Sequence, residues 1–155
     1  MAEKDARTRR VLAENRKARH EFELVEKLEA GLVLTGSETK SLRDGKGNIN
    51  EAWVRFEGGE AWLMDAHIQP YPQAGPYQNH EPTRPRKLLL KGEQLDRWAK
   101  RVQEKGLTVV PLVLYFIGPW VKVELGLGRG RKLHDKRHAI KDRENRRELE
   151  RALRR

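Results

Sequence analysis

The chain has 155 residues, which is enough for one domain with a real core and short for two. Charged residues make up 36% of it, above the roughly 25% that is typical of globular domains. It has no cysteine, which excludes disulfides and thiolate metal sites and suits a reducing cytoplasm. No apolar run approaches the ~18 residues of a membrane span, and the first residues lack the apolar core of a signal peptide. We therefore expect a cytoplasmic protein with no membrane span.

The net charge of +10 is concentrated at the two ends of the chain. Residues 1–20 hold seven Lys or Arg against three Asp or Glu, and residues 131–155 hold eleven against five. The segment between them is neutral, with fifteen residues of each sign. Such basic ends indicate a polyanionic partner, with RNA or DNA first and an anionic membrane second. A merely solubilising tail is the alternative.

The first elements are expected between residues 20 and 45. Short alternating apolar stretches predict two strands over 20–35, although 20–29 would also fit a helix. The run from Thr35 to Glu38 matches a capping box and predicts the start of a short helix. Leu42 is the apolar anchor of this helix, and Gly45 is its stop.

The middle of the chain predicts a hairpin followed by a long loop. Two aromatic-rich runs, 51–57 and 60–67, flank Gly58-Gly59, and glycine supplies the positive φ angles of a tight turn. Five of the seven prolines then fall within residues 70–85, which indicates an irregular connection.

A helix and a second hairpin are predicted next. The apolar residues within 93–105 recur with the spacing of one helix face, and Gly106 ends the helix. The runs 108–116 and 120–125 predict two strands joined across 117–119. Alternation then places three side chains of the second strand inward: Val121, Val123 and Leu125.

These elements predict a mainly β fold, namely an OB-like antiparallel barrel with flanking short helices. We divide the chain into a basic leader (1–19), the barrel (20–128) and a basic tail (129–155), with the glycines of 126–130 as a flexible joint. At least three of the four tryptophans are expected in the core: Trp53, Trp62, Trp98 and Trp120. The tail has too few apolar residues to order alone, so we expect it to be disordered in isolation and helical on a partner.

No catalytic site is evident, and we predict that the protein is not an enzyme and needs neither a cofactor nor a metal. The chain has no P-loop, zinc-protease or serine-hydrolase motif. The glycines of 126–130 lack the spacing of a dinucleotide loop. His134 and His138 could clamp a metal only on a helix, and RNA contact or plain solvation is favoured over it.

Two clusters of cations favour contact with RNA. Arg16, Lys17, Arg19 and His20 stand just before the first expected strand, where phosphate contact is favoured over a solubilising role. A second cluster, residues 84–87, stands between the proline-rich loop and the next apolar run. For it, phosphate contact and anchoring of the loop remain equally open.

Several motifs, in the same order from about residue 13 to the C-terminus, resemble those of the SmpB (small protein B) family, which binds transfer-messenger RNA. They are Glu14–His20, Glu29–Gly36, Glu38–Arg43, Gly45–Asn48, Pro82–Leu90 and Gly130–Arg137. The resemblance implies an OB-like barrel that grips the tRNA-like domain of transfer-messenger RNA. It also implies delivery, with elongation factor Tu, to the empty A site of a stalled ribosome for trans-translation. There the tail would become helical while it probes the decoding centre and the vacant mRNA channel.

By position, the resemblance assigns two sets of residues. The RNA grip comprises Arg16, Lys17, Arg19, His20, Glu29, Lys40, Arg43, Lys46, Arg86, Lys87 and Leu89. The ribosome contacts of the tail comprise Lys132, His134, Asp135, Lys136, Arg137, Lys141, Arg143, Arg151, Ala152 and Leu153. For Glu29, spacing alone favours a solvated turn acid, and the resemblance reverses that interpretation. A constitutive ribosomal or tRNA-binding barrel protein and an RNA-processing enzyme are the alternatives.

Overall fold

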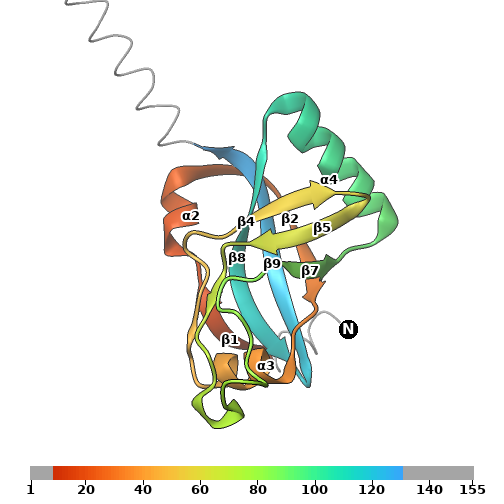
Figure 1. The fold of residues 1–155 in the computed structure, drawn as a ribbon. Coiled ribbons are helices and arrows are strands. Elements are labelled where there is room, and N and C mark those ends of the chain that lie inside the picture. Colours follow the sequence, from red (N-terminus) through yellow and green to blue (C-terminus); the bar gives the residue numbers. More distant parts are fainter. Residues whose placement is uncertain (1–8, 131–155) are drawn as a thin grey trace, which may run out of the picture.

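The computed structural model describes residues 9–130, which form one curved sheet with three helices at its margins (Figure 1). In chain order the elements are β1 (Arg9–Glu14), α2 (Arg16–Glu21), β2 (Phe22–Leu32), α3 (Gly36–Arg43), β3 (Gly47–Asn48), β4 (Trp53–Glu57), β5 (Glu60–Met64), β6 (His67–Ile68), the 3₁₀ turn η1 (Pro72–Ala74), β7 (Arg86–Leu89), α4 (Gly92–Lys105), β8 (Thr108–Ile117) and β9 (Trp120–Gly130). No helix in this part of the chain is long and apolar enough to cross a membrane.

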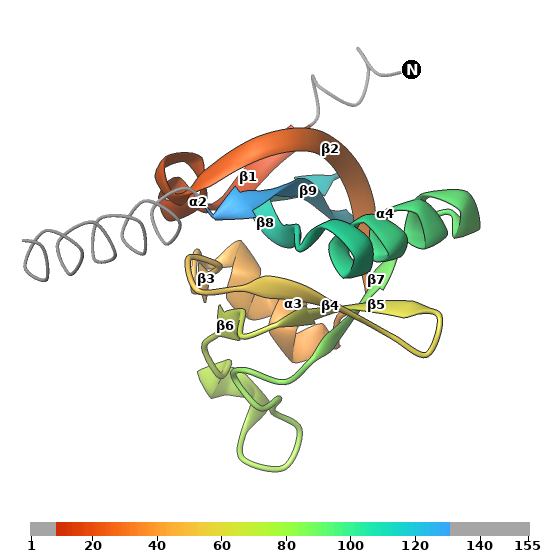
Figure 2. The same ribbon diagram turned by 90° about the horizontal axis from the view of Figure 1, so that it is seen from above.

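The sheet has seven strands in the order β1-β8-β9-β2-β7-β5-β4, and every neighbouring pair is antiparallel. A short ribbon of β3 and β6 lies beside it. The sheet curls so far that β4, at one edge, contacts β8, which is second from the other edge. Figure 2 shows this as two layers, with β1, β8, β9 and β2 facing β4, β5 and β7. The predicted mainly β, OB-like fold is confirmed, with more strands than expected.

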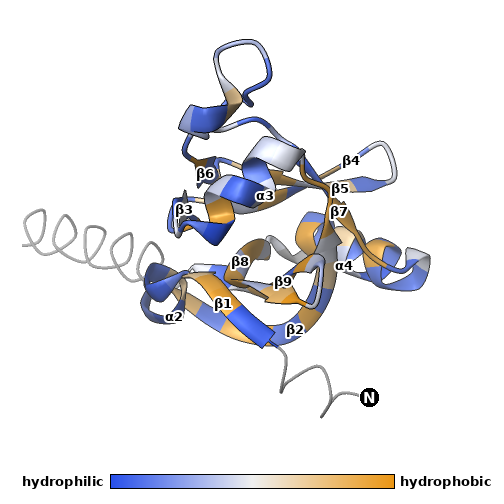
Figure 3. Cartoon of the chain, turned by 90° about the horizontal axis from the view of Figure 1, so that it is seen from below, coloured by the Kyte–Doolittle hydropathy of each residue, from blue (hydrophilic) through white to orange (hydrophobic). Residues whose placement is uncertain are grey.

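The main core fills the space between the two layers, where Figure 3 shows apolar strands facing each other. Val123 and Leu125 are fully buried there, as alternation along β9 predicted. A second, smaller core lies on the outer side of β8, where Ala18 of α2 packs against Val110 and Leu112. Because β8 is covered on both faces, its sequence is a nearly continuous apolar run.

The N-terminal part of the barrel differs from the sequence prediction. Residues 9–19, which we had assigned to a leader, form β1 and most of α2, and β1 pairs with β8 from Arg9↔Ile117 to Glu14↔Val113. The two strands predicted over 20–35 are one strand, β2, which bends at a bulge between Leu24 and Glu26. Burial alternates along β2 without a break across this bulge, but the inward position 26 holds Glu26, which pairs with Arg97 and Arg101 of α4. A charged residue at an inward position interrupts the apolar pattern, so the sequence of one strand resembles two.

The glycines of 126–130 are not a joint, because they lie inside β9. A Cβ atom on Gly128 would stand 2.4 Å from the carbonyl oxygen of Glu23, and one on Gly126 would stand 2.8 Å from Leu24 Cδ2. Because these positions have no side chain, the backbone at the start of β2 can lie close to the end of β9, where Leu24 is paired with Gly128. The prediction failed because glycine spacing does not distinguish a flexible segment from a close contact between backbones.

This contact gives a stability prediction. Gly128→Ala should lower the free energy of unfolding by about 1–3 kcal/mol, because the methyl group meets backbone atoms that cannot rotate away. Gly36→Ala is the matched control, since a Cβ there has no atom within 4 Å, and it should change stability by less than about 0.5 kcal/mol. Urea unfolding followed by circular dichroism measures both. If the two variants are equally stable, β2 and β9 can move apart enough to accept the methyl group without a loss of stability.

The elements that depend on local signals are where the sequence predicted them. Thr35 caps α3 in a complete capping box with Glu38. Gly58 and Gly59 have φ angles of 61° and 72° in the turn between β4 and β5. The helix α4 ends at Gly106, which is left-handed with φ 62°.

The tryptophan prediction is wrong. Only Trp98 is fully buried, whereas Trp53 is 38% exposed, Trp120 is 68% exposed and Trp62 is half-buried. Trp53 and Trp62 occupy the outward positions of β4 and β5, and the Trp53 indole donates a hydrogen bond to Asp65 at 2.8 Å.

Candidate nucleic-acid interface

The short helix α2 carries the first cluster of cations and is held on the sheet by Asn15. The Asn15 side chain accepts from the backbone N–H of Ala18 at the helix start, and its amide donates to the carbonyl of Pro111 at 2.8 Å. Its own backbone N–H donates to Leu112. With Ala18 buried, the remaining face of the helix points outward. Arg16, Lys17, Arg19 and His20 are all exposed, as phosphate-binding groups must be.

One of these cations is already paired. The Lys17 ammonium lies 2.5 Å from the Glu51 carboxylate, which precedes β4. The hydrogen bond from Lys17 and the charge of Glu51 raise the pKa of that ammonium above its ordinary value. Lys17 therefore links α2 to the β4 side of the barrel, and RNA would have to compete with Glu51 for it.

The helix α3 presents another group of cations, outside the two clusters found in the sequence. Leu42 is fully buried against the core, so the opposite side of the helix is exposed and carries Lys40 and Arg43, with Lys46 just beyond its end. The Arg43 guanidinium lies 5.5 Å from the centre of the Phe116 ring, and the Lys40 ammonium lies 5.8 Å from the centre of the Tyr71 ring. Because these side chains are exposed, they remain free to neutralise phosphates.

Arg86 is not part of an RNA-binding surface, which corrects the prediction for this residue. Its side chain is fully buried and pairs with the equally buried carboxylate of Glu38. It also donates to the carbonyls of Ala66 at 2.7 Å and Pro82 at 2.9 Å. Arg84 adds a second cation to Glu38 at 2.6 Å. Of the two roles left open for residues 84–87, anchoring of the loop holds for both arginines.

Glu38 is the centre of this network. Burial by itself would raise the pKa of its carboxyl group. The hydrogen bonds from Arg84, the Thr35 N–H and Arg86, together with the charge of Arg86, outweigh burial and hold that pKa below its usual range. The carboxylate thus stays charged at neutral pH and ties α3 to β7 and to the loop before it.

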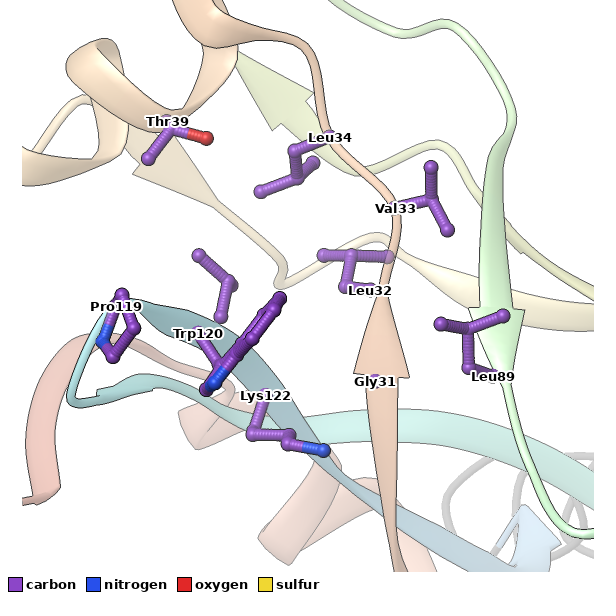
Figure 4. Close-up of a pocket in the computed structure, with 10 residues that line it drawn as sticks. Gly31, Leu32, Val33, Leu34, Thr39, Leu89, Pro119, Trp120 and Lys122 are labelled. Atoms are coloured by element: carbon purple, nitrogen blue, oxygen red, sulfur yellow. The ribbon is translucent and has the colours of Figure 1, made fainter.

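The next residues of β7 do face outward. Lys87 is half-exposed and pairs with Glu60 at 3.1 Å, and the side chain of Leu89 is 53% exposed. Leu89 lines a surface pocket of about 350 Å³ together with Val33, Trp120 and Lys122. Figure 4 shows Trp120 and Lys122 on one side of the end of β2, with Val33 and Leu89 on the other. An exposed apolar surface that is rimmed by a lysine can accept the flat face of a base and its phosphate.

Glu29 lies in the middle of β2 and not in a turn, so the interpretation based on spacing is wrong. It is directly opposite Glu124 of β9, and like charges placed so repel each other. Tyr115 offsets part of this repulsion, because its hydroxyl group donates a hydrogen bond to the Glu29 carboxylate. Glu124 is balanced by Arg9 at 3.4 Å and Lys27 at 3.7 Å.

Tyr115 is a reliable donor in this cluster. Burial raises the pKa of its hydroxyl well above the usual value of a tyrosine, and the hydrogen bond to Glu29 and the charge of Glu29 raise it further. The phenol therefore keeps its proton at any biological pH. The Arg9 guanidinium lies 3.8 Å from the centre of the Tyr115 ring and closes the cluster on its outer side.

The structure separates the predicted RNA-binding residues into two groups. In the view of Figure 1, α2 lies at the upper end of the barrel and α3 at the lower end, near the turn between β8 and β9. Thr39 of α3 also lines the pocket of Leu89 and Trp120, so the α3 cations and this pocket are adjacent. All the predicted tail contacts, from Lys132 to Leu153, lie outside the described residues.

Sequence reasoning missed three residues of this surface. Asn15 was detectable, because asparagine ahead of a basic run is a typical helix N-cap. Trp120 was one of the four tryptophans of which at least three were expected in the core, and Lys122 was given no role. Nothing local marks these two, since the pocket forms only where β2, β7 and the β8–β9 turn meet. Within residues 9–130, no three His, Cys, Asp or Glu side chains are grouped so as to hold a metal ion.

Comparison with known proteins gives consistent matches over most of the chain. Residues 12–155 match the family model of the SmpB protein. The SsrA-binding protein of Roseiflexus sp. (strain RS-1) is 57% identical over 144 residues, which cover 93% of this chain and 91% of that protein. The SsrA-binding protein of Microcystis aeruginosa (strain NIES-843 / IAM M-2473) is 46% identical over 155 residues, the full length of both.

A solved structure is similar as well. It is described as "tmRNA-SmpB: a journey to the center of the bacterial ribosome", and one of its chains is 49% identical to this one. The two superpose with a TM-score of 0.63, over 76% of this chain and 82% of that chain.

Proposed function

The chain belongs to the SmpB family, and on this premise we propose that it binds the tRNA-like domain of transfer-messenger RNA and brings it to the A site of stalled ribosomes. It acts there in trans-translation as a non-catalytic adaptor, and elongation factor Tu joins through the alanyl-transfer-messenger RNA complex. The observation that carries this function is an identity of 46–57% over nearly the whole chain to proteins named for binding SsrA RNA.

The barrel provides the grip on the tRNA-like domain. The α3 cations Lys40, Arg43 and Lys46 neutralise phosphates, and the adjacent pocket of Leu89 and Trp120 accepts a base. Arg86 holds this surface in place from inside and makes no contact itself. Glu29, fixed by Tyr115, offers a carboxylate to base edges or 2′-hydroxyl groups.

The two separated groups of cations suit an adaptor with two large partners. The helix α2 carries four exposed polar or basic side chains away from α3, so it can meet a second RNA surface while α3 holds the first. We assign the decoding centre and the mRNA channel to the tail, through the basic residues after Gly130. The barrel then spans residues 9–130, and residues 131–155 act as a separate arm.

The test is selectivity for the tRNA-like domain. The full-length chain should bind a minimal tRNA-like transcript far more tightly than ordinary tRNA, with an affinity that falls as salt rises. A constitutive ribosomal or tRNA-binding protein would show no such preference, and this result would refute the proposal. The RNA should be recovered intact after incubation with Mg²⁺, because protein-dependent cleavage would contradict a non-catalytic role.

The same assay tests the pocket. Leu89→Glu should reduce the affinity for the tRNA-like transcript by at least about tenfold, because a carboxylate there repels phosphate and removes apolar contact. Val25→Glu is the matched control, since Val25 is also 53% exposed but lies outside the pocket. Equal binding by the two variants would remove this pocket from the interface while leaving the family function untouched.

A further inference from the structure

A second pocket lies between α3 and the loop after β6, on the side of the molecule where Figures 2 and 3 show this loop projecting next to α3 and β6. Its volume is about 430 Å³, which is within the range of small-ligand sites. The lining is mostly polar and includes Ser37 and Lys40 of α3 and Tyr71, Gln73 and Gln78 of the loop. It shares no lining residue with the pocket of Leu89 and Trp120.

The loop that forms one wall is held at its base by side-chain hydrogen bonds. Asn79 accepts from the backbone N–H of Tyr71 at 3.0 Å and donates to the carbonyl of Tyr71 at 2.8 Å, which closes the loop on itself. The buried His80 donates through Nε2 to the carbonyl of Ile68, and its Nδ1 lies 2.9 Å from the Ser37 hydroxyl. Because the loop is fixed to α3, the pocket is formed before a ligand binds. Little conformational entropy of the loop is then lost on binding.

The chemistry of the lining corresponds to the parts of a nucleotide. The Tyr71 ring offers a flat aromatic wall, and the amides of Gln73 and Gln78 can each donate to and accept from a base edge. Neither amide has a hydrogen-bond partner among the described residues. Lys40 lies beside the Tyr71 ring and can reach a phosphate, with Arg43 exposed on the same helix.

We propose that this pocket binds an unpaired RNA nucleotide, with its base against Tyr71 and its edge read by Gln73 and Gln78. This inference rests on the proposed RNA-binding function and adds a site that reads a base. Tyr77, which is 98% exposed on the same loop, provides a platform for a neighbouring base. A polar lining with cations beside it suits RNA and not an apolar peptide.

The test uses the full-length chain with Gln73→Ala and Gln78→Ala combined. The matched control combines Gln69→Ala and Gln103→Ala, two exposed glutamines that lie outside the pocket. One arm measures affinity for full-length transfer-messenger RNA, and the other measures binding of the preformed protein–RNA complex to stalled ribosomes. Loss of two base-edge contacts should weaken binding about tenfold in one arm, with the control unchanged.

The arm that responds identifies the source of the nucleotide, transfer-messenger RNA or ribosomal RNA. Ultraviolet cross-linking of the wild-type complexes, followed by mass spectrometry, should place a nucleotide adduct on the peptide that contains Tyr71 and Tyr77. If neither arm responds, or if this peptide cross-links only to protein, the pocket is not a nucleotide site. Retained selectivity for the tRNA-like transcript would then show that the proposed function stands without it.

Discussion

Replacing Arg86 with methionine is expected to lower the free energy of unfolding by about 3–5 kcal/mol at neutral pH, although Arg86 was predicted from the sequence to contact RNA. The substitution leaves the buried Glu38 carboxylate without its closest cation and frees the carbonyls of Ala66 and Pro82. A charge that stays buried without its partner costs far more than the net contribution of the intact pair. Urea unfolding, followed by circular dichroism, measures the change.

Two further variants separate charge from packing. Adding Glu38→Gln to the Arg86 variant removes the orphaned charge but keeps a capping-box side chain at this position, so the double variant should be more stable than the single one. Arg84→Met should cost less, because the Arg84 side chain is 31% exposed and Glu38 retains Arg86. If the single Arg86 variant loses less than about 1 kcal/mol of unfolding free energy, the Glu38 network does not hold α3 against β7 as described.

The effect of the Arg86 variant should depend on pH in a defined direction. The pKa of Glu38 is lowered in the folded wild-type chain, so its contribution to stability is fully present above the unfolded pKa. That contribution is lost as pH falls through the folded pKa. Without Arg86, burial dominates and the Glu38 pKa rises. The difference in unfolding free energy between the two proteins should therefore shrink as pH falls from the folded Glu38 pKa of the variant to the lower folded pKa of the wild type, and a constant difference would contradict this origin.

Truncation after Gly130 is expected to abolish peptide tagging on stalled ribosomes while binding of the tRNA-like transcript largely persists. The last registered pair of β9 is Phe22↔Gly130, so the cut leaves every strand pairing of the barrel in place. It removes eleven basic and five acidic residues and lowers the net charge from +10 to +4. The measurements are tagging in a reconstituted translation system and transcript affinity at several salt concentrations.

A tail of the same composition in scrambled order is the control for this truncation. It restores the charge but not the order of residues such as His134, Asp135 and Arg137, so it should recover non-specific affinity for ribosomes without tagging. If the truncated chain tags normally, the tail has no role in rescue. If the scrambled tail tags normally, the tail acts by charge alone and the assigned positions are wrong.

The elements predicted correctly are those whose cause lies within a few residues. The capping box of Thr35 and Glu38, the Gly58-Gly59 turn and the periodicity that ends at Gly106 are all local, and each was found at its place. The prediction of the site residues was only partly correct. Arg86 and Lys87 are adjacent cations, but in a strand one must face inward, and only the pairing of β7 with β2 and β5 determines which one does.

The sequence by itself determined the fold class, the family and the concentration of positive charge at the two ends, because these depend on composition, local periodicity and the order of motifs. Tertiary structure alone decided that Arg86 is an anchor, that Trp53 and Trp120 are exposed and that the glycines of β9 are contact points. It also created both pockets. The physical reason is that burial and close approach belong to pairs of segments far apart in the chain, which meet only when the sheet has curled.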